Sequence, residues 1–252
     1  MAGISMNFRS YELKMNSLLT LVLPDSGRIG KLPLSGRRVL YLLHGISQDG
    51  SSWLRHSHIE QVAEASGIVV VMPSAGRSLY CDNVNGQNYF SYIASELPAY
   101  LNLVFGLSRK REDNFIAGLS MGGLGATKIA LTFPENYSAV GSFSGPLDFR
   151  PLLPQITEEW KNEFPFMLSM LDDPDNSPLN PVALLDAQKH QALKMYIACG
   201  FQDDLYETNT AFTDRVAQLG LSAEAVFEDG AHNWEFWDRH VKLFIETYLP
   251  AL

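Results

Sequence analysis

The chain has 252 residues, of which 46% are hydrophobic and 19% are charged, and its formal net charge at pH 7 is −9. This length and composition predict a single globular α/β domain over residues 1–252 and exclude a largely disordered chain. The acidic balance argues against nucleic acid or an anionic membrane as a partner, because both require a positively charged surface.

The first predicted element is an antiparallel hairpin at the edge of a sheet. Residues 6–24 contain two strand-like segments, and we expect a turn near residues 15–17 to join them. The N-terminal segment lacks the apolar stretch of a signal peptide, and no later run reaches the roughly 18 apolar residues of a membrane span. Two cysteines, Cys81 and Cys199, fit a reducing compartment. We therefore expect a cytoplasmic protein without membrane association.

Short apolar runs follow, and several of them are apolar on consecutive residues. This pattern is typical of parallel strands that are covered on both faces. The predicted strands lie within residues 39–45, 67–73, 114–120, 139–145, 194–200 and 222–230. Helical spacing is found within residues 56–66, 91–105, 121–133, 209–220 and 235–249. The alternation predicts a mostly parallel, doubly wound α/β sheet with the hairpin as an antiparallel edge.

Residues 146–190 interrupt this alternation before the penultimate strand. The segment is rich in proline, aromatic and acidic residues, where a single crossover helix would suffice. We interpret it as an enlarged crossover that forms a wall or lid over a site at the carboxyl ends of the strands. A surface decoration without function is the alternative.

Residues 118–122 read Gly-Leu-Ser-Met-Gly, which fits the motif G-x-S-x-G between a predicted strand and a predicted helix. The glycines leave room for a sharp, strained turn that presents Ser120, and the helix N-terminus favours developing negative charge. A dinucleotide fingerprint would need glycine in place of Lys128, and a phosphate-binding loop would need lysine in place of Leu124. A glycine-rich helix start without chemistry is the remaining alternative.

A serine nucleophile requires a general base and a third group that orients the base. Among the six histidines, His232 lies on a loop between the last predicted strand and the last predicted helix, where this architecture supplies its base. His56 and His58 form an H-x-H pair, but no further cluster of ligands supports a metal site. We expect neither a metal nor another cofactor.

The acid should follow the penultimate predicted strand, residues 194–200, where Asp203 is our first choice and Asp204 the alternative. For the oxyanion we expect the backbone N–H groups of Met121 and Ile46, with that of Gly45 as a neighbouring candidate.

Aromatic side chains in or beside loops at the same edge of the sheet are candidates for lining a substrate pocket, although core packing would explain each of them equally well. They are Trp53, Tyr89, Phe90, Phe149 and Trp234.

These segments resemble the esterase D-like family of α/β hydrolases, and most closely bacterial tributyrin esterases. The most specific blocks are FIAGLSMGG at residues 115–123 and HNWEFW at residues 232–237. The resemblance implies the α/β-hydrolase fold, with Ser120 as nucleophile, Asp203 as acid and His232 as base. It also implies activity on short-chain acyl esters, and it is compatible with a homo-oligomer.

The sequence thus predicts a serine carboxylesterase that hydrolyses a small-molecule ester through an acyl-enzyme intermediate. An acyltransferase, or a thioesterase such as an S-formylglutathione hydrolase, could use the same three residues. A non-catalytic binding module is disfavoured, because such proteins commonly lose a member of the triad and all three are present.

Overall fold

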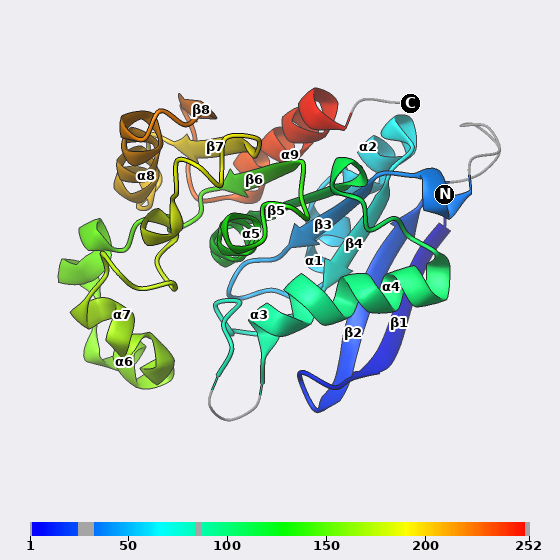
Figure 1. Cartoon of the computed structure of the whole chain (residues 1–252), viewed down its shortest axis with the longest axis horizontal. Coiled ribbons are helices and arrows are strands. Elements are labelled where there is room, and N and C mark those ends of the chain that lie inside the picture. The colour runs from blue at the N-terminus through cyan, green and yellow to red at the C-terminus, as the bar shows by residue number, and fades with distance from the viewer. Residues whose placement is uncertain (1, 25–32, 84–86, 250–252) are drawn as a thin grey trace.

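The structure is a computed structural model that describes residues 2–24, 33–83 and 87–249. In these residues eight strands form one sheet in the order β1-β2-β4-β3-β5-β6-β7-β8 (Figure 1). The strands are β1 (Ala2–Ser10), β2 (Met15–Leu23), β3 (Val39–Leu43), β4 (Val69–Pro73), β5 (Asn114–Leu119), β6 (Ala139–Phe143), β7 (Lys194–Gly200) and β8 (Ala223–Glu228). Strand β2 pairs antiparallel with β1 and β4, and all other pairs are parallel. The predicted sheet with its antiparallel edge hairpin is confirmed.

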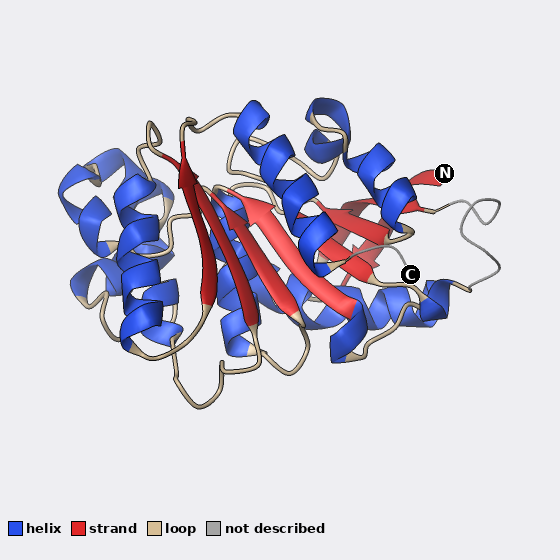
Figure 2. Cartoon of the chain, turned by 90° about the horizontal axis from the view of Figure 1, so that it is seen from above, coloured by secondary structure: helices blue, strands red, loops and turns tan. Residues whose placement is uncertain are grey.

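Helices cover both faces of the sheet (Figure 2). They are α1 (Ser52–His56), α2 (Ile59–Ser66), α3 (Tyr89–Ser91), α4 (Leu97–Phe105), α5 (Met121–Thr132), α6 (Glu158–Glu163), α7 (Leu168–Asp172), α8 (Tyr206–Gln218) and α9 (Trp234–Tyr248). Successive residues of a strand point to opposite faces. Leu40 and Leu42 of β3 accordingly belong to a buried cluster with α1, α2 and α9, whereas Tyr41 and Leu43 belong to a second cluster with α4, α5 and α8.

The turn of the N-terminal hairpin lies at residues 11–14, earlier than the predicted residues 15–17. A distant carboxylate accounts for the difference. Glu96 accepts hydrogen bonds from the Ser10 hydroxyl and from the Tyr11 N–H, the latter at 2.7 Å, and the Ser10 hydroxyl oxygen accepts one from the Leu13 N–H at 3.0 Å. The two contacts with Glu96 join residues more than 80 positions apart, so local sequence gives no sign of them.

Residues 91–105, which show continuous helical spacing, form the end of α3, a π-helical turn (Tyr92–Glu96) and α4. Pro98 in the first turn of α4 has no N–H to donate to the carbonyl four residues earlier, which favours a change of helix type at this point.

Residues 146–190 lie between β6 and the penultimate strand β7, where an insertion is predicted. They contain a 3₁₀ segment (Arg150–Gln155), α6 and α7. Figure 1 shows α6 and α7 set off from the helices that cover the sheet.

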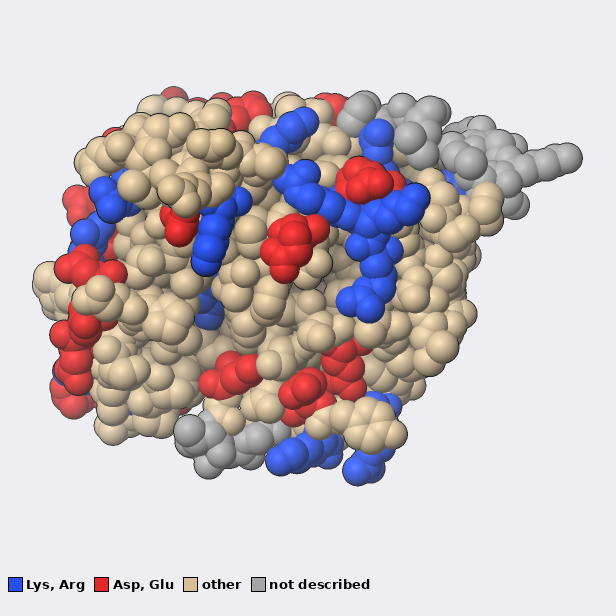
Figure 3. All heavy atoms as spheres, viewed as in Figure 1, with Lys and Arg blue, Asp and Glu red and all other residues tan. Residues whose placement is uncertain are grey.

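None of the described helices has the length and apolarity that crossing a membrane requires. On the face drawn in Figure 3, lysine and arginine side chains lie among aspartate and glutamate side chains, with wide areas that carry neither.

Candidate active site

Ser120 forms the sharp turn between β5 and α5. Its φ of 51° and ψ of −121° lie in a region that side chains other than glycine rarely adopt. The turn is held by the Ser120 N–H, which donates to the carbonyl of Phe143 at 2.8 Å. A Cβ on Gly118 would lie 2.4 Å from the carbonyl carbon of Gly122, and a Cβ on Gly122 would lie 2.3 Å from the carbonyl oxygen of Leu43. Both positions therefore require glycine for this turn to form.

The structure brings Ser120, His232 and Asp203 into one hydrogen-bonded row. Nε2 of His232 lies 3.0 Å from Oγ of Ser120, and its Nδ1 lies 3.0 Å and 3.1 Å from the two carboxylate oxygens of Asp203. Ser120 follows β5, His232 follows β8 and Asp203 follows β7, so all three lie at the carboxyl edge of the sheet. Asp204, the alternative acid, is exposed to solvent, and the imidazole bonds to Asp203 instead of Asp204 within the described residues. This is the arrangement in which a serine hydroxyl can be deprotonated.

The carboxylate of Asp203 is enclosed, since its side chain has no exposed surface, whereas that of His232 is 36% exposed. Burial acts to raise the pKa of Asp203, but the hydrogen bonds and charge of His232, together with hydrogen bonds from Ser144 and the Leu205 N–H, outweigh it and hold the pKa below its ordinary value. The Leu205 N–H donates to Oδ1 at 2.9 Å. Asp203 is therefore ionised at neutral pH.

Two backbone N–H groups stand beside Ser120 without a hydrogen-bond acceptor in the described part of the chain. They belong to Met121, the first residue of α5, and to Ile46, which follows β3. Gly45 is a different case, because its N–H donates to Oε1 of Gln48 at 3.0 Å. The structure thus leaves Met121 and Ile46 as candidate oxyanion donors and argues against Gly45.

His44 supports the loop that carries Ile46. Its Nδ1 lies 2.7 Å from the carbonyl oxygen of Gly45, and its Nε2 accepts the Ala75 N–H at 2.8 Å. Burial, partly offset by the hydrogen bond to Gly45, lowers the pKa of the imidazole. A neutral ring donates through one nitrogen and accepts through the other, as these contacts require.

A cavity of about 350 Å³ opens above Ser120. The body of the domain contributes Ile46, Leu79, Met121 and Leu205, and the insertion contributes Pro146, Phe149, Leu152, Gln155, Ile156, Thr157 and Trp160. In the described chain none of the lining residues is charged. Such a cavity favours an apolar group that is attached to the reacting carbonyl.

Only one of the five predicted aromatic residues lines this cavity, namely Phe149. Trp53 is fully buried, and its indole N–H donates to the carbonyl of Leu43 at 3.0 Å, so the prediction of a pocket role for it is wrong. Trp234 packs against Trp53 at 5.2 Å on the side of α1. Phe90 packs against Phe133 at 6.0 Å, and Tyr89 lines a separate cavity.

Sequence reasoning missed Trp160 and Leu79, which both line the cavity. Trp160 lies on α6 within the insertion, where the prediction named no pocket residue besides Phe149. Leu79 adopts a φ of 49°, and local sequence gives no signal for that conformation at a leucine.

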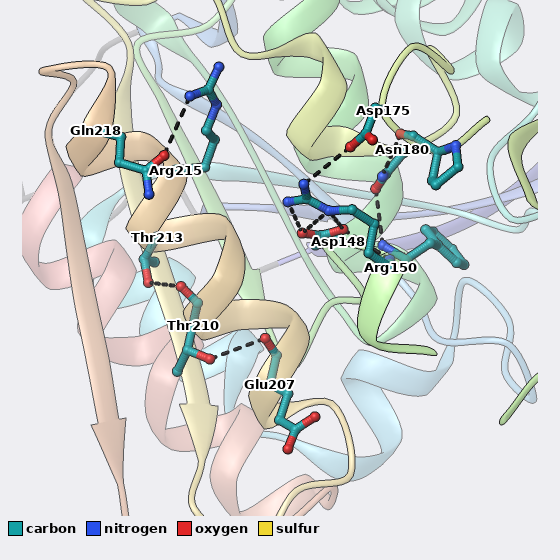
Figure 4. Close-up of polar contacts among 11 residues, drawn as sticks. Asp148, Arg150, Asp175, Asn180, Glu207, Thr210, Thr213, Arg215 and Gln218 are labelled. Carbon is teal, nitrogen blue, oxygen red and sulfur yellow. Dashed lines mark hydrogen bonds and ion pairs between the residues drawn. The ribbon is translucent and has the colours of Figure 1, made fainter. Parts of the chain in front are cut away.

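The pocket wall around Phe149 is anchored by a polar network (Figure 4). The guanidinium of Arg150 binds the carboxylate of Asp148, with Nε 2.9 Å from Oδ2, and reaches Asp175 at 3.1 Å. Oδ1 of Asn180 accepts the Phe149 N–H at 3.1 Å, and its amide donates to the carbonyl of Pro174 at 2.9 Å. Because the carboxylate of Asp148 is buried, this ion pair holds the backbone at the start of the insertion against the protein interior.

The two histidines of the H-x-H pair make contacts of other kinds. His58 pairs with Asp238, with Nδ1 2.6 Å from Oδ2, and His56 stacks on Trp234 at 5.0 Å. The described residues contain no group of three or more histidine, cysteine or acidic side chains that could hold a metal ion.

Comparisons with known proteins show which family the chain resembles. The model of the Esterase family, described as "Putative esterase", matches residues 12–243. The acetyl esterase of Caldicellulosiruptor saccharolyticus is 28% identical, with 96% of each chain covered. Two structures from Staphylococcus aureus are 31% identical over 98% of each chain: the fluorophosphonate-binding serine hydrolase F, with a TM-score of 0.87, and an S-formylglutathione hydrolase, with a TM-score of 0.86.

Proposed function

The chain belongs to the Esterase family and is a serine esterase with the α/β-hydrolase fold, and we propose that it hydrolyses short-chain acyl esters through an acyl-enzyme formed on Ser120. The observation that carries this proposal is the row of hydrogen bonds from Ser120 Oγ through the imidazole of His232 to the buried carboxylate of Asp203.

In the proposed reaction, Nε2 of His232 takes the proton of Ser120 as Oγ attacks the ester carbonyl. The N–H groups of Met121 and Ile46 bind the oxyanion, and Met121 adds the positive end of the α5 dipole. His232 then gives the proton to the departing alcohol, and a water molecule, activated in the same way, releases the acid from Ser120. Asp203 holds the imidazole in the orientation and tautomer that both steps need.

The substrate class follows from the cavity. Its roughly 350 Å³ and its uncharged, largely apolar wall favour a small acyl group, and the similarity to an acetyl esterase supports this size. We also propose that the chain is most closely related to tributyrin esterases, as the blocks at residues 115–123 and 232–237 imply. The two cysteines are free and buried, which supports our further proposal of a cytoplasmic location.

The experiment that tests this assignment combines turnover with covalent labelling. Ser120→Ala should abolish hydrolysis of p-nitrophenyl butyrate and labelling by a fluorophosphonate probe, while the thermal unfolding midpoint stays close to that of the wild type. Ser142→Ala is the matched control, because it removes a hydroxyl from the neighbouring strand β6. Labelling of the Ser120→Ala variant at the wild-type rate would refute the role of Ser120.

A thioester hydrolase is the second candidate, since one similar structure is an S-formylglutathione hydrolase. The same acyl-enzyme would form, with a thiol in place of the alcohol as leaving group. The absence of a charged side chain from the described cavity lining favours the ester, because glutathione carries two carboxylates. Comparison of kcat/KM for S-formylglutathione and for p-nitrophenyl acetate decides between them, and added acceptor alcohols reveal any acyl transfer among the products.

A further inference from the structure

Ser144 occupies an unusual position directly behind the proposed triad. It is the first residue after β6, it is fully buried, and its φ of 56° is one that non-glycine residues rarely adopt. Its N–H donates to the carbonyl of Ala198 on the neighbouring strand β7 at 2.8 Å. A side chain held in such a conformation inside the protein must be fixed by its surroundings.

Trp237, on α9, contacts both Ser144 and His232. Its indole N–H donates to Oγ of Ser144 at 3.1 Å, and its ring stands perpendicular to the His232 imidazole with centroids 4.9 Å apart. Trp237 is itself 5% exposed, so solvent does not compete for the indole N–H.

The hydroxyl of Ser144 also interacts with the carboxylate of Asp203. Although burial opposes ionisation, the Ser144 hydroxyl acts together with the hydrogen bonds of His232 to keep the pKa of Asp203 low, and the thiol of Cys199 lies against both side chains. Because the indole N–H occupies one lone pair of the Ser144 oxygen, the hydroxyl proton is left for Asp203 or for the sulfur of Cys199, and the charged carboxylate is the stronger acceptor of the two. Ser144 and Trp237 thus touch the acid and the base without reaching the cavity.

We propose that Ser144 and Trp237 are positioning residues for the reaction: Trp237 orients the Ser144 hydroxyl toward Asp203 and packs against His232, so that acid and base stay aligned on Ser120. This inference rests on the proposed function. It adds a second layer to the site, contributed by β6 and α9.

The test uses three substitutions in the full chain. Ser144→Ala and Ser144→Gly both remove the hydroxyl, but glycine also tolerates the positive φ. An effect that comes from loss of the hydroxyl should therefore appear in both variants, whereas an effect of backbone strain should differ between them. Trp237→Phe keeps an aromatic ring beside His232 and removes the indole N–H. Ser142→Ala is the control, because Ser142 is buried two residues earlier, on β6, and its hydroxyl has no hydrogen-bond partner among the described residues.

We expect each of the three variants to lower kcat for p-nitrophenyl butyrate by about 10-fold or more, the usual scale for loss of a hydrogen bond to a charged group. KM should stay nearly constant, since neither residue lines the cavity. Loss of a donor makes the carboxylate of Asp203 more basic, so the coupled Asp203–His232 pair takes up its proton at a higher pH and the acid limb of kcat/KM moves upward. Ser144→Ala combined with Trp237→Phe should cost little more than one substitution alone, because both break the same connection.

An unmoved acid limb with a normal kcat, or full additivity in the double variant, would overturn the proposal. If the wild type neither turns over esters nor reacts with a fluorophosphonate, the proposed function fails instead. In that case the low-field NMR resonance of the proton between His232 and Asp203 still tests the positioning role. The resonance should shift or broaden in Ser144→Ala and remain unchanged in Ser142→Ala, and an unchanged resonance in Ser144→Ala would refute the role.

Discussion

Replacement of Asp203 by asparagine tests whether the carboxylate sets the tautomer of His232. Oδ1 of Asp203 accepts the Leu205 N–H at 2.9 Å, and only the oxygen of an asparagine amide can accept that bond. The amide nitrogen must therefore take the place of Oδ2, which lies 3.0 Å from Nδ1 of His232. Nδ1 then faces the amide nitrogen at the 3.0 Å position and the amide oxygen at the 3.1 Å position, and the nearer donor favours the tautomer in which Nδ1 accepts and the ring proton, now on Nε2, faces Oγ of Ser120. His232 can then no longer accept the serine proton.

The expected loss is large. An asparagine that imposes the wrong tautomer in a serine triad lowers kcat by about 10⁴-fold, which corresponds to about 5 kcal/mol of transition-state stabilisation. The assay is the initial rate of p-nitrophenyl butyrate hydrolysis, with the rate of fluorophosphonate labelling as a measure of nucleophile activation. Asp204→Asn is the matched control, because Asp204 is the next residue and is exposed. The reasoning fails if Asp203→Asn keeps more than about a tenth of wild-type kcat, or if Asp204→Asn loses as much.

Three further predictions concern stability and specificity. Although burial opposes it, the hydrogen bonds and charge of His232 hold the pKa of Asp203 below its ordinary value, so the ionised carboxylate stabilises the fold above that ordinary value, and this contribution is lost as the pH falls through the folded-state pKa. Urea unfolding at pH 6 and pH 3 should therefore show a smaller effect of pH in Asp203→Asn than in the wild type. Gly122→Ala would place a Cβ 2.3 Å from a backbone oxygen of β3, so we expect the free energy of unfolding to fall by about 1–3 kcal/mol and kcat to decrease. Gly3→Ala is the control, because its Cβ would have no atom within 4 Å, and it should change neither quantity. Phe149→Ala should raise the ratio of octanoyl to butyryl kcat/KM by about 10-fold, since two newly buried methylenes contribute roughly 0.8 kcal/mol each; Phe90→Ala, outside the cavity, should leave the ratio unchanged.

The order of strands and helices could be read from the sequence because consecutive apolar residues and helical spacing are local signals. The nucleophile and the base could be chosen among the serines and histidines for a related reason. In a parallel sheet the loops after the strands meet at one edge, so Ser120 and His232 needed only to be placed after the right strands. The turn of the hairpin could not be placed, because Glu96, far along the chain, decides it.

The aromatic residues show where local reasoning ends. Trp53 and Phe149 stand in similar sequence contexts beside predicted loops, yet Trp53 points into the core and Phe149 into the cavity. The difference depends on how α1 and the insertion pack, and neither has a periodic pattern long enough to predict a buried face. Ser144 was missed because a positive φ at a serine has no sequence signature.

The loop that carries His232 must cross two strands to reach Ser120, and contacts with the loop after β7 hold it in that position. Strands in a sheet lie about 4.8 Å apart, so β8 is about 14 Å from β5, and a histidine after β8 can meet Ser120 only if its loop leans back across β7 and β6. Gly200 and Gly230 make this possible, because a Cβ on Gly200 would lie 2.1 Å from the carbonyl oxygen of Gly230. Gln202 then clamps the two loops: its N–H donates to the Gly230 carbonyl at 3.0 Å, and its side-chain oxygen accepts the Gly230 N–H at 2.8 Å. The loop after β7 therefore does more than supply the acid, since it also holds the segment that delivers the base.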